Sequence, residues 1–181
     1  MGRVVSRPNL QAALKRVRKN KGSPGIDGMT VEELSGHLRE NWPQLRDQLL
    51  AGKYRPAMVR QELIPKSGGG MRKLGIPIVL DRFIQQALLQ VLQPMFDPTF
   101  SQHSHGFRPG RRAHDAVIEA QRYIQQGRKV VVDVDLEQFF DRVNHDVLMG
   151  RLAKRIGDGR VLGLIRGYLE AGILANGCAT E

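Results

Sequence analysis

The segment Val130–His145 reads VVVDVDLEQFFDRVNH and combines a run of β-branched residues, two spaced carboxylates and an aromatic pair. Valine favours extended backbone, so the run predicts a β-strand over Val130–Val134. Alternation along that strand would place Asp133 and Asp135 on one face and the even-numbered valines on the other. The pattern is typical of metal-assisted chemistry at a strand end. Two solvated aspartates are the alternative, and this segment alone favours neither.

Positive charge is concentrated in the first two thirds of the chain. Residues 1–129 hold 22 Lys and Arg against 10 Asp and Glu, whereas residues 130–181 hold 6 against 8. A polyanionic partner such as RNA or DNA explains this asymmetry, because side chains that neutralise phosphates release bound counterions. A basic surface that serves only solubility is the alternative.

Size and cysteine content limit the class of protein. The chain has 181 residues, 41% of them apolar, and a single cysteine, Cys178. It can bury a core as one domain, or as one domain plus part of another. One cysteine excludes an intrachain disulfide and a cysteine-based zinc site, which indicates a reducing compartment. No apolar run approaches the roughly 20 residues needed to span a bilayer, so we expect a cytoplasmic protein.

The N-terminal region predicts a basic amphipathic helix. Ser6 and Pro8 mark its start, and Leu10, Leu14 and Val17 recur at helical spacing. The cations on and just after this helix are Lys15, Arg16, Arg18, Lys19 and Lys21. A solvated face is the alternative, but no acidic residue lies among these cations, which favours contact with phosphates.

A loop and two short helices are expected to follow. Thr30 and Glu33 have the spacing of a capping box that starts a helix. Trp42 and Pro43 are expected to separate this helix from a second one over Gln44–Ala51, because proline disrupts the helical hydrogen-bond ladder.

The next segment predicts a β-hairpin with cations at its tip. Val59–Pro65 and Met71–Ile76 are strand-like, and Ser67–Gly70 is rich in glycine. Closing this hairpin would bring together Lys66 and Arg72, an arrangement suited to a triphosphate. An exposed basic turn is the alternative, and the residues alone favour it.

A core helix and a basic loop complete the middle of the chain. The helix begins near Val79, and its apolar stripe is Ile84, Leu88, Val91, Leu92 and Met95. Asp81 and Arg82 at its start remain unassigned. The loop Phe107–Arg112 leads into a helix over Ala113–Gly127 and contributes Arg108, Arg111 and Arg112 as candidate RNA contacts. The histidines of this region, His103, His105 and His114, lie in no recognised metal-binding arrangement, so a zinc or iron site is not expected.

Four blocks in order resemble one family, the reverse transcriptases encoded by bacterial group II introns, which also act as maturases. The blocks are NKGSPGIDGMTVEEL (Asn20–Leu34), IPKSGGGMRKLGIPIVLDRFIQQAL (Ile64–Leu88), HSHGFRPGRRAHDAV (His103–Val117) and the segment quoted above. The resemblance implies an α+β fold, with mostly helical fingers, a small antiparallel hairpin, and the first strand and helices of the palm. It also implies three parts: an RNA-facing N-terminal extension (1–52), the fingers (53–128) and a partial palm with the first catalytic aspartate (129–181).

The resemblance assigns roles to particular residues. Asp135 matches the family's first metal-binding aspartate, with Leu136 as a carbonyl ligand to a two-ion Mg²⁺ site; Asp133 is the second candidate. Phe140 would lie beneath the nucleotide sugar, unless it is simply a core aromatic beside Phe139. In similar enzymes the fingertip Lys and Arg hold the triphosphate, which implies Lys66 and Arg72, with Lys73 as an auxiliary.

The chain also departs from the family. The aromatic-Ala-Asp-Asp motif and the preceding Thr-Pro-Gln-Gly segment are missing, and no Asp-Asp pair occurs. We therefore interpret the 181 residues as a fragment, inactive alone in polymerisation, of an RNA-directed DNA polymerase. The expected partners are intron or template RNA, a DNA primer and dNTP, and self-association into a homodimer is a further expectation. The alternatives are a non-catalytic RNA-binding module and the fingers of a retron or diversity-generating enzyme.

Overall fold

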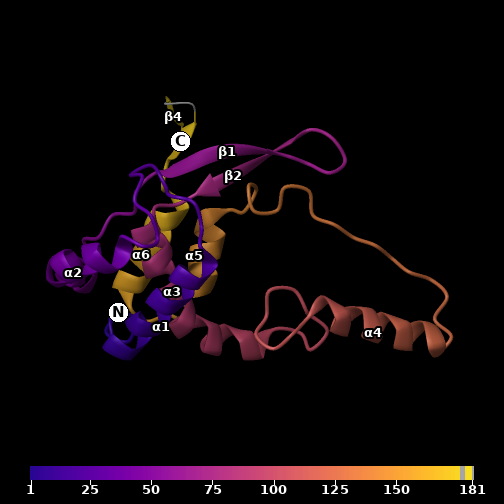
Figure 1. Ribbon diagram of the computed structural model, residues 1–181. Coiled ribbons are helices and arrows are strands. Elements are labelled where there is room, and N and C mark those ends of the chain that lie inside the picture. Colours follow the sequence, from indigo (N-terminus) through magenta and orange to yellow (C-terminus); the bar gives the residue numbers. More distant parts are fainter. Residues whose placement is uncertain (176–177, 181) are drawn as a thin grey trace. The chain divides into compact units, whose positions relative to one another are not determined.

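The computed structural model describes residues 1–175 and 178–180 and has a mixed α+β architecture, as the sequence predicted (Figure 1). The chain divides into two compact units. Residues 1–91 together with 144–181 form the first unit, and residues 92–143 form the second. No helix in the described part of the chain is long and apolar enough to cross a membrane.

The first unit is built mainly from helices. They are α1 (Arg7–Asn20), α2 (Leu34–Leu50), most of α3 (Val79–Phe96), α5 (His145–Ala153) and α6 (Gly159–Leu169). Helix α1 starts as predicted, with Pro8 in its first turn, and buries Ala13 and Val17. It ends where Lys21 adopts a left-handed conformation with a φ of 46°.

Helix α2 differs from the prediction in one respect. The capping interaction forms, because the Thr30 N–H donates to Glu33 Oε2 at 2.7 Å, and a turn over residues 31–33 precedes the regular helix. The expected break at Pro43 is wrong, since α2 continues through this proline. Packing offsets the missing hydrogen bond: Trp42 meets the buried Phe83 edge to face at 6.2 Å, and Leu34 and Leu49 are buried.

Four strands form one sheet in the order β2-β1-β3-β4. Strands β1 (Val59–Pro65) and β2 (Met71–Ile76) form the predicted antiparallel hairpin, with Arg60 paired to Ile76 and Pro65 to Met71. Strand β3 (Ile173–Ala175) lies parallel to β1 and antiparallel to β4 (Cys178–Thr180). Sequence reasoning did not predict β3 and β4, because each has only three residues.

A buried carboxylate joins three segments of the first unit. Asp81, in the first turn of α3, is 1% exposed. Its Oδ1 accepts hydrogen bonds from the hydroxyls of Tyr54, at 2.8 Å, and Tyr168, at 3.0 Å. Its Oδ2 accepts the backbone N–H of Ala57 at 2.9 Å. Burial raises the pKa of Asp81, and burial together with this carboxylate raises the pKa of both tyrosines. The segment before β1, the start of α3 and the end of α6 therefore meet at one side chain.

The second unit contains the last residues of α3, a 3₁₀ turn (Asp97–Thr99) and α4 (Ala113–Gln125). The stripe predicted for α3 is only partly buried: Ile84 and Leu88 are buried in the first unit, but Met95 is 40% exposed. The strand predicted over Val130–Val134 is wrong for this structure, because the segment has no sheet partner among the described residues (Figure 1). A strand needs inter-strand hydrogen bonds, and none are available to this segment in the part of the chain described.

Replacing Asp81 by alanine should lower the free energy of unfolding by about 2–4 kcal/mol, because a buried hydroxyl, a partly buried hydroxyl and one N–H would be left without their acceptor. Urea denaturation followed by circular dichroism measures this decrease. The control is Asp47→Ala on the surface of α2, where the side chain is 77% exposed. It should change stability by less than about 0.5 kcal/mol. Equal effects of the two variants would contradict the role assigned to Asp81.

Candidate functional site

Asp135 lies at the exposed end of the valine run, just before a turn over residues 137–142. Its Oδ1 accepts the backbone N–H of Leu136 at 2.9 Å, and its Oδ2 has no partner among the residues that the structure describes. The two residues line a shallow pocket of about 320 Å³ with Glu137, Phe139, Arg142 and Val143. The carboxylate is therefore accessible, and it is not buried in an apolar interior.

The neighbouring predicted site residues are also at the surface. Asp133 is exposed, and Phe140 is 87% exposed and does not line the Asp135 pocket. The Phe140 ring packs edge to face against Phe139, with centroids 5.4 Å apart. The valines at 130, 131, 132 and 134 are 77–84% exposed. The segment therefore lacks the sheet that would orient its side chains.

The oxygen donors near Asp135 are of the kind that Mg²⁺ prefers, namely a carboxylate and a backbone carbonyl. A two-ion site needs several such ligands around two metal ions that lie roughly 4 Å apart. Among the described residues, no group of three or more His, Cys, Asp or Glu is arranged to hold a metal. The residues present thus fit part of a Mg²⁺ site and do not complete one.

The tip of the β1–β2 hairpin brings Lys66 and Arg72 together. The Lys66 N–H donates to the Gly70 carbonyl at 3.0 Å, and Gly69 and Gly70 adopt positive φ, which closes the turn. Lys66 and Arg72 line the same pocket of about 400 Å³. Lys73 follows Arg72 in the strand, and alternation places it on the opposite face. Both cations therefore border one pocket at the hairpin tip.

A cationic groove runs beside α1. Four of the five predicted cations line it together with one acid, Glu32: they are Lys15, Arg18, Lys19 and Lys21. Arg16 is exposed but does not line this groove. The groove measures about 510 Å³, and Leu14 contributes an apolar wall. Its charge suits a phosphate backbone.

The three arginines of the basic loop have different surroundings. The Arg108 side chain is 9% exposed and pairs with Asp97 at 2.9 Å, and its Nη1 donates to the carbonyls of Ser101 and Ser104 at 2.7 and 3.1 Å. This pair lowers the pKa of Asp97 and raises that of Arg108. Arg111 donates to the Gln102 carbonyl, and Arg112 is exposed. Arg108 thus organises the loop, and Arg112 presents its guanidinium to solvent.

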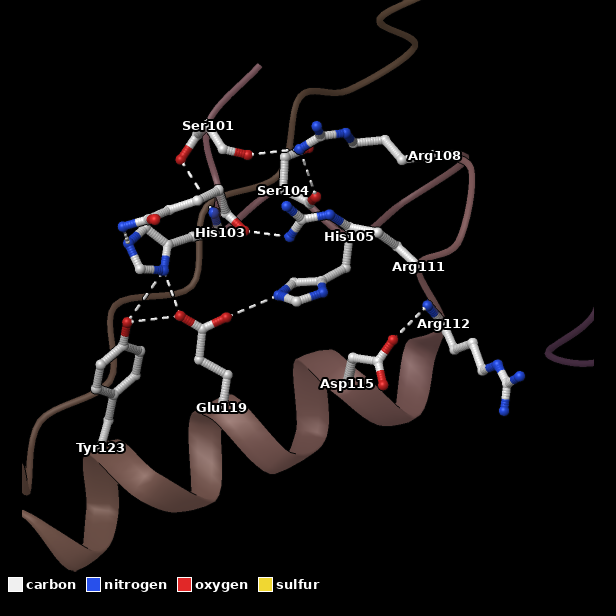
Figure 2. A network of polar contacts seen from close by, with 11 residues as sticks. Ser101, His103, Ser104, His105, Arg108, Arg111, Arg112, Asp115, Glu119 and Tyr123 are labelled. Atoms are coloured by element: carbon white, nitrogen blue, oxygen red, sulfur yellow. Dashed lines mark hydrogen bonds and ion pairs between the residues drawn. The ribbon is translucent and has the colours of Figure 1, made fainter. Parts of the chain in front are cut away.

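Sequence reasoning missed a cluster that joins the residues just before the basic loop to α4. Glu119 and Tyr123 project from α4 toward His103 and His105 (Figure 2). Because Glu119 lies 16 and 14 residues after these histidines, short-range metal motifs could not reveal the contact. The available signal was the spacing of Asp115, Glu119 and Tyr123, which places all three on one face of a helix.

Comparison with known proteins identifies the family. The model for "Reverse transcriptase (RNA-dependent DNA polymerase)" matches residues 64–180, which include most of the hairpin, the basic loop and Asp135. The chain belongs to the reverse transcriptase family. This confirms the family resemblance inferred from the four sequence blocks.

Individual relatives agree with that assignment. The chain is 34% identical over 177 residues to Protein YkfC of Escherichia coli (strain K12), which covers 94% of this chain and 46% of that protein. It is 33% identical over 176 residues to Group II intron-encoded protein LtrA of Lactococcus lactis subsp. cremoris, covering 96% of this chain and 29% of LtrA. This reverse transcriptase chain therefore spans less than half the length of these relatives.

A solved structure supports the fold. The partial Cas6-RT-Cas1–Cas2 complex contains a chain that aligns with a TM-score of 0.61 and 23% sequence identity, covering 97% of this chain and 28% of that one. The mixed fold of helices and a small sheet is thus shared with a reverse transcriptase-containing protein.

Proposed function

We propose that this chain forms the fingers and the beginning of the palm of an RNA-directed DNA polymerase of the group II intron type. The observation that carries the proposal is the family match over residues 64–180, which includes the accessible carboxylate of Asp135. Similarity to an intron-encoded protein favours this type over retron or diversity-generating enzymes.

In the proposed enzyme, Asp135 and the Leu136 carbonyl bind Mg²⁺. The ions would lower the barrier to attack by a primer hydroxyl and neutralise the leaving group. Asp135 supplies one open carboxylate oxygen, and further carboxylates must come from other polypeptide, because this segment holds no Asp-Asp pair. Phe140 is the proposed contact beneath the nucleotide sugar, and its exposure leaves it free to make one.

The hairpin tip is the proposed site for the triphosphate. An ammonium and a guanidinium that share one pocket match a ligand with several charges and forked acceptors. No acidic residue of the described chain lines this pocket, which favours an anionic ligand. Lys73 is assigned a lesser role, because alternation places it on the opposite strand face.

Intron or template RNA is the proposed partner of the basic surfaces. The groove beside α1 contributes Lys15, Arg18, Lys19 and Lys21, and the basic loop contributes Arg111 and Arg112. Arg16 is retained as an exposed flanking contact, whereas Arg108 is left out of direct contact because its donors are used within the loop.

Further partners follow from the exposed segment. The apolar side chains over residues 130–140 would pack against additional polypeptide, either a downstream region or a second copy of the chain. A DNA primer and dNTP are the remaining proposed partners of the whole enzyme. We place its action in the cytoplasm, where intron RNA and nucleotides are found together.

The catalytic part of the proposal is tested with the longer protein that includes the downstream residues. Asp135→Asn should lower primer extension on an RNA template more than about 100-fold, because it removes a charged metal ligand. RNA affinity should stay within about twofold, since no cation is removed. The 181-residue chain alone should not extend a primer.

The matched control is Asp133→Asn, which makes the same chemical change two residues earlier in the chain and should reduce extension less. If Asp133→Asn abolished extension while Asp135→Asn retained it, the assignment of the metal ligand would be wrong. Full activity of both variants would reject the proposed metal site.

The RNA-binding part is tested with the 181-residue chain and a fluorescein-labelled RNA stem-loop. The logarithm of affinity should fall linearly with the logarithm of salt concentration. Replacing Lys15 and Arg18 together by glutamine should reduce the slope by about 0.7–0.9 for each phosphate that is no longer neutralised. Lys154→Gln, an exposed cation after α5, is the control and should leave the slope unchanged. A salt-independent affinity would exclude phosphate contact.

A further inference from the structure

One carboxylate connects the loop 101–112, which ends with the basic loop, to α4. Glu119 Oε2 contacts His105 Nε2 at 2.7 Å, and Glu119 Oε1 accepts the Tyr123 hydroxyl at 2.8 Å and contacts His103 Nδ1 (Figure 2). Glu119 and Tyr123 belong to α4, and both histidines belong to the loop. These contacts lower the pKa of Glu119 to about 2, with His105 contributing most. Glu119 is therefore ionised at any physiological pH.

The charged groups around this cluster are mostly cations. Glu119 and the two histidines line a cavity of about 560 Å³. Arg111, Arg122 and Asp115 line it as well. The Arg128 guanidinium lies over the Tyr123 ring, 4.7 Å from its centroid. On electrostatic grounds alone, removing the negative charge of Glu119 would leave this surface more positive and would strengthen RNA binding.

The two histidines are not equivalent. His105 has a side chain that is 14% exposed, and its Nδ1 is buried without a hydrogen-bond partner among the described residues. A second proton on this ring would create a buried N–H with no acceptor, which is unfavourable. The His103 side chain is 54% exposed; its Nδ1 contacts Glu119, and its Nε2 lies 3.3 Å from the side-chain amide nitrogen of Gln102. The His105 ring is therefore enclosed and fixed by Glu119, whereas the His103 ring is open to solvent.

The loop has a second anchor at its base. Arg108 pairs with Asp97 and holds the carbonyls of Ser101 and Ser104. This anchor fixes one side of the loop, and the Glu119 cluster fixes residues 103–105 on α4. Arg111 and Arg112 are the last two residues of this loop and lead into the first turn of α4. The direction in which their side chains point therefore depends on both anchors.

We propose that Glu119 is a positioning residue, which holds the loop 101–112 on α4 so that Arg111 and Arg112 can bind RNA, and that this hold tightens when His103 gains a proton. The inference rests on the proposed RNA-binding function and adds a pH dependence to it. An imidazolium–carboxylate pair is stronger than a neutral hydrogen bond, and histidine changes charge between about pH 5 and 8.

The test compares two substitutions that remove the same charge from the same helix face. Glu119→Gln weakens the hold on His103 and should weaken binding of a fluorescein-labelled RNA stem-loop about three- to tenfold. Asp115→Asn is the matched control. Its side-chain oxygen can still accept the Arg112 N–H, which lies 2.8 Å away in the wild type, so binding should stay equal or become slightly tighter. Because electrostatics alone predicts tighter binding for both, weaker binding by Glu119→Gln alone supports positioning.

The pH profile separates positioning from a general structural role. The ratio of wild-type to Glu119→Gln affinity should increase as the pH falls from about 8 to about 6, because only the wild-type chain forms the charged pair. His103→Gln keeps a neutral donor and should bind RNA like the wild type at about pH 8 while lacking this increase. A ratio that does not change with pH would overturn the proposed proton dependence.

A measurement without RNA keeps the inference distinct from the proposed function. Trypsin should cleave after Arg111 faster in Glu119→Gln than in the wild type or Asp115→Asn, because the loop is no longer held on α4. Equal cleavage rates in all three chains would overturn the positioning role. Faster cleavage without any RNA binding by the wild type would overturn the RNA-binding proposal and its extension to Glu119.

Discussion

The first unit depends on the environment of Asp81. A carboxylate that is 1% exposed is costly to bury unless its oxygens are hydrogen-bonded, and here three donors satisfy it. These donors come from the segment before β1 and from α6, while Asp81 itself begins α3. The same interaction therefore sets the base of the hairpin against the helix core. The pairing of β1 with β3, just after α6, extends this connection into the sheet.

The segment that carries Asp135 has a different constraint. Its valines and Phe140 have strong β-propensity, yet more than three quarters of each side chain is exposed, and no strand forms. Intrinsic preference cannot replace hydrogen-bond partners, because a single strand leaves its backbone groups to water. The proposed metal site shares this dependence. In that proposal Asp135 offers one carboxylate, and a neighbouring strand would orient it and supply its companion ligands.

Local signals in the sequence predicted much of the fold. The ends of β1 and β2 were predicted to the residue, because the glycine turn at 67–70 separates two alternating segments. The prediction for α2 was wrong because it relied on Pro43 to end the helix. The Trp42–Phe83 contact helps the helix continue through this proline, and sequence spacing cannot show that contact. Asp81 stayed unassigned for the same reason: its tyrosine partners lie 27 and 87 residues away.

The candidate site was predictable where its residues are close in sequence. Lys66 and Arg72 meet because a tight hairpin joins them, and the α1 cations share a groove because they lie on one helix and its end. Arg108 shows why the charge of a residue does not by itself predict its role. Its guanidinium forms an ion pair with Asp97 and holds the loop, which the sequence alone could not show. The Glu119 cluster required knowledge of how the loop folds onto α4.

The central proposal is that polypeptide outside these 181 residues supplies a strand that pairs with the segment before Asp135 and completes the metal site. Amide hydrogen exchange over Val130–Val134 tests this claim most directly. These amides should exchange at unprotected rates in the 181-residue chain. In a longer protein that contains downstream residues, their exchange should be slower by a factor of about 100 or more. Rapid exchange in both proteins, or strong protection in the 181-residue chain, would contradict the claim.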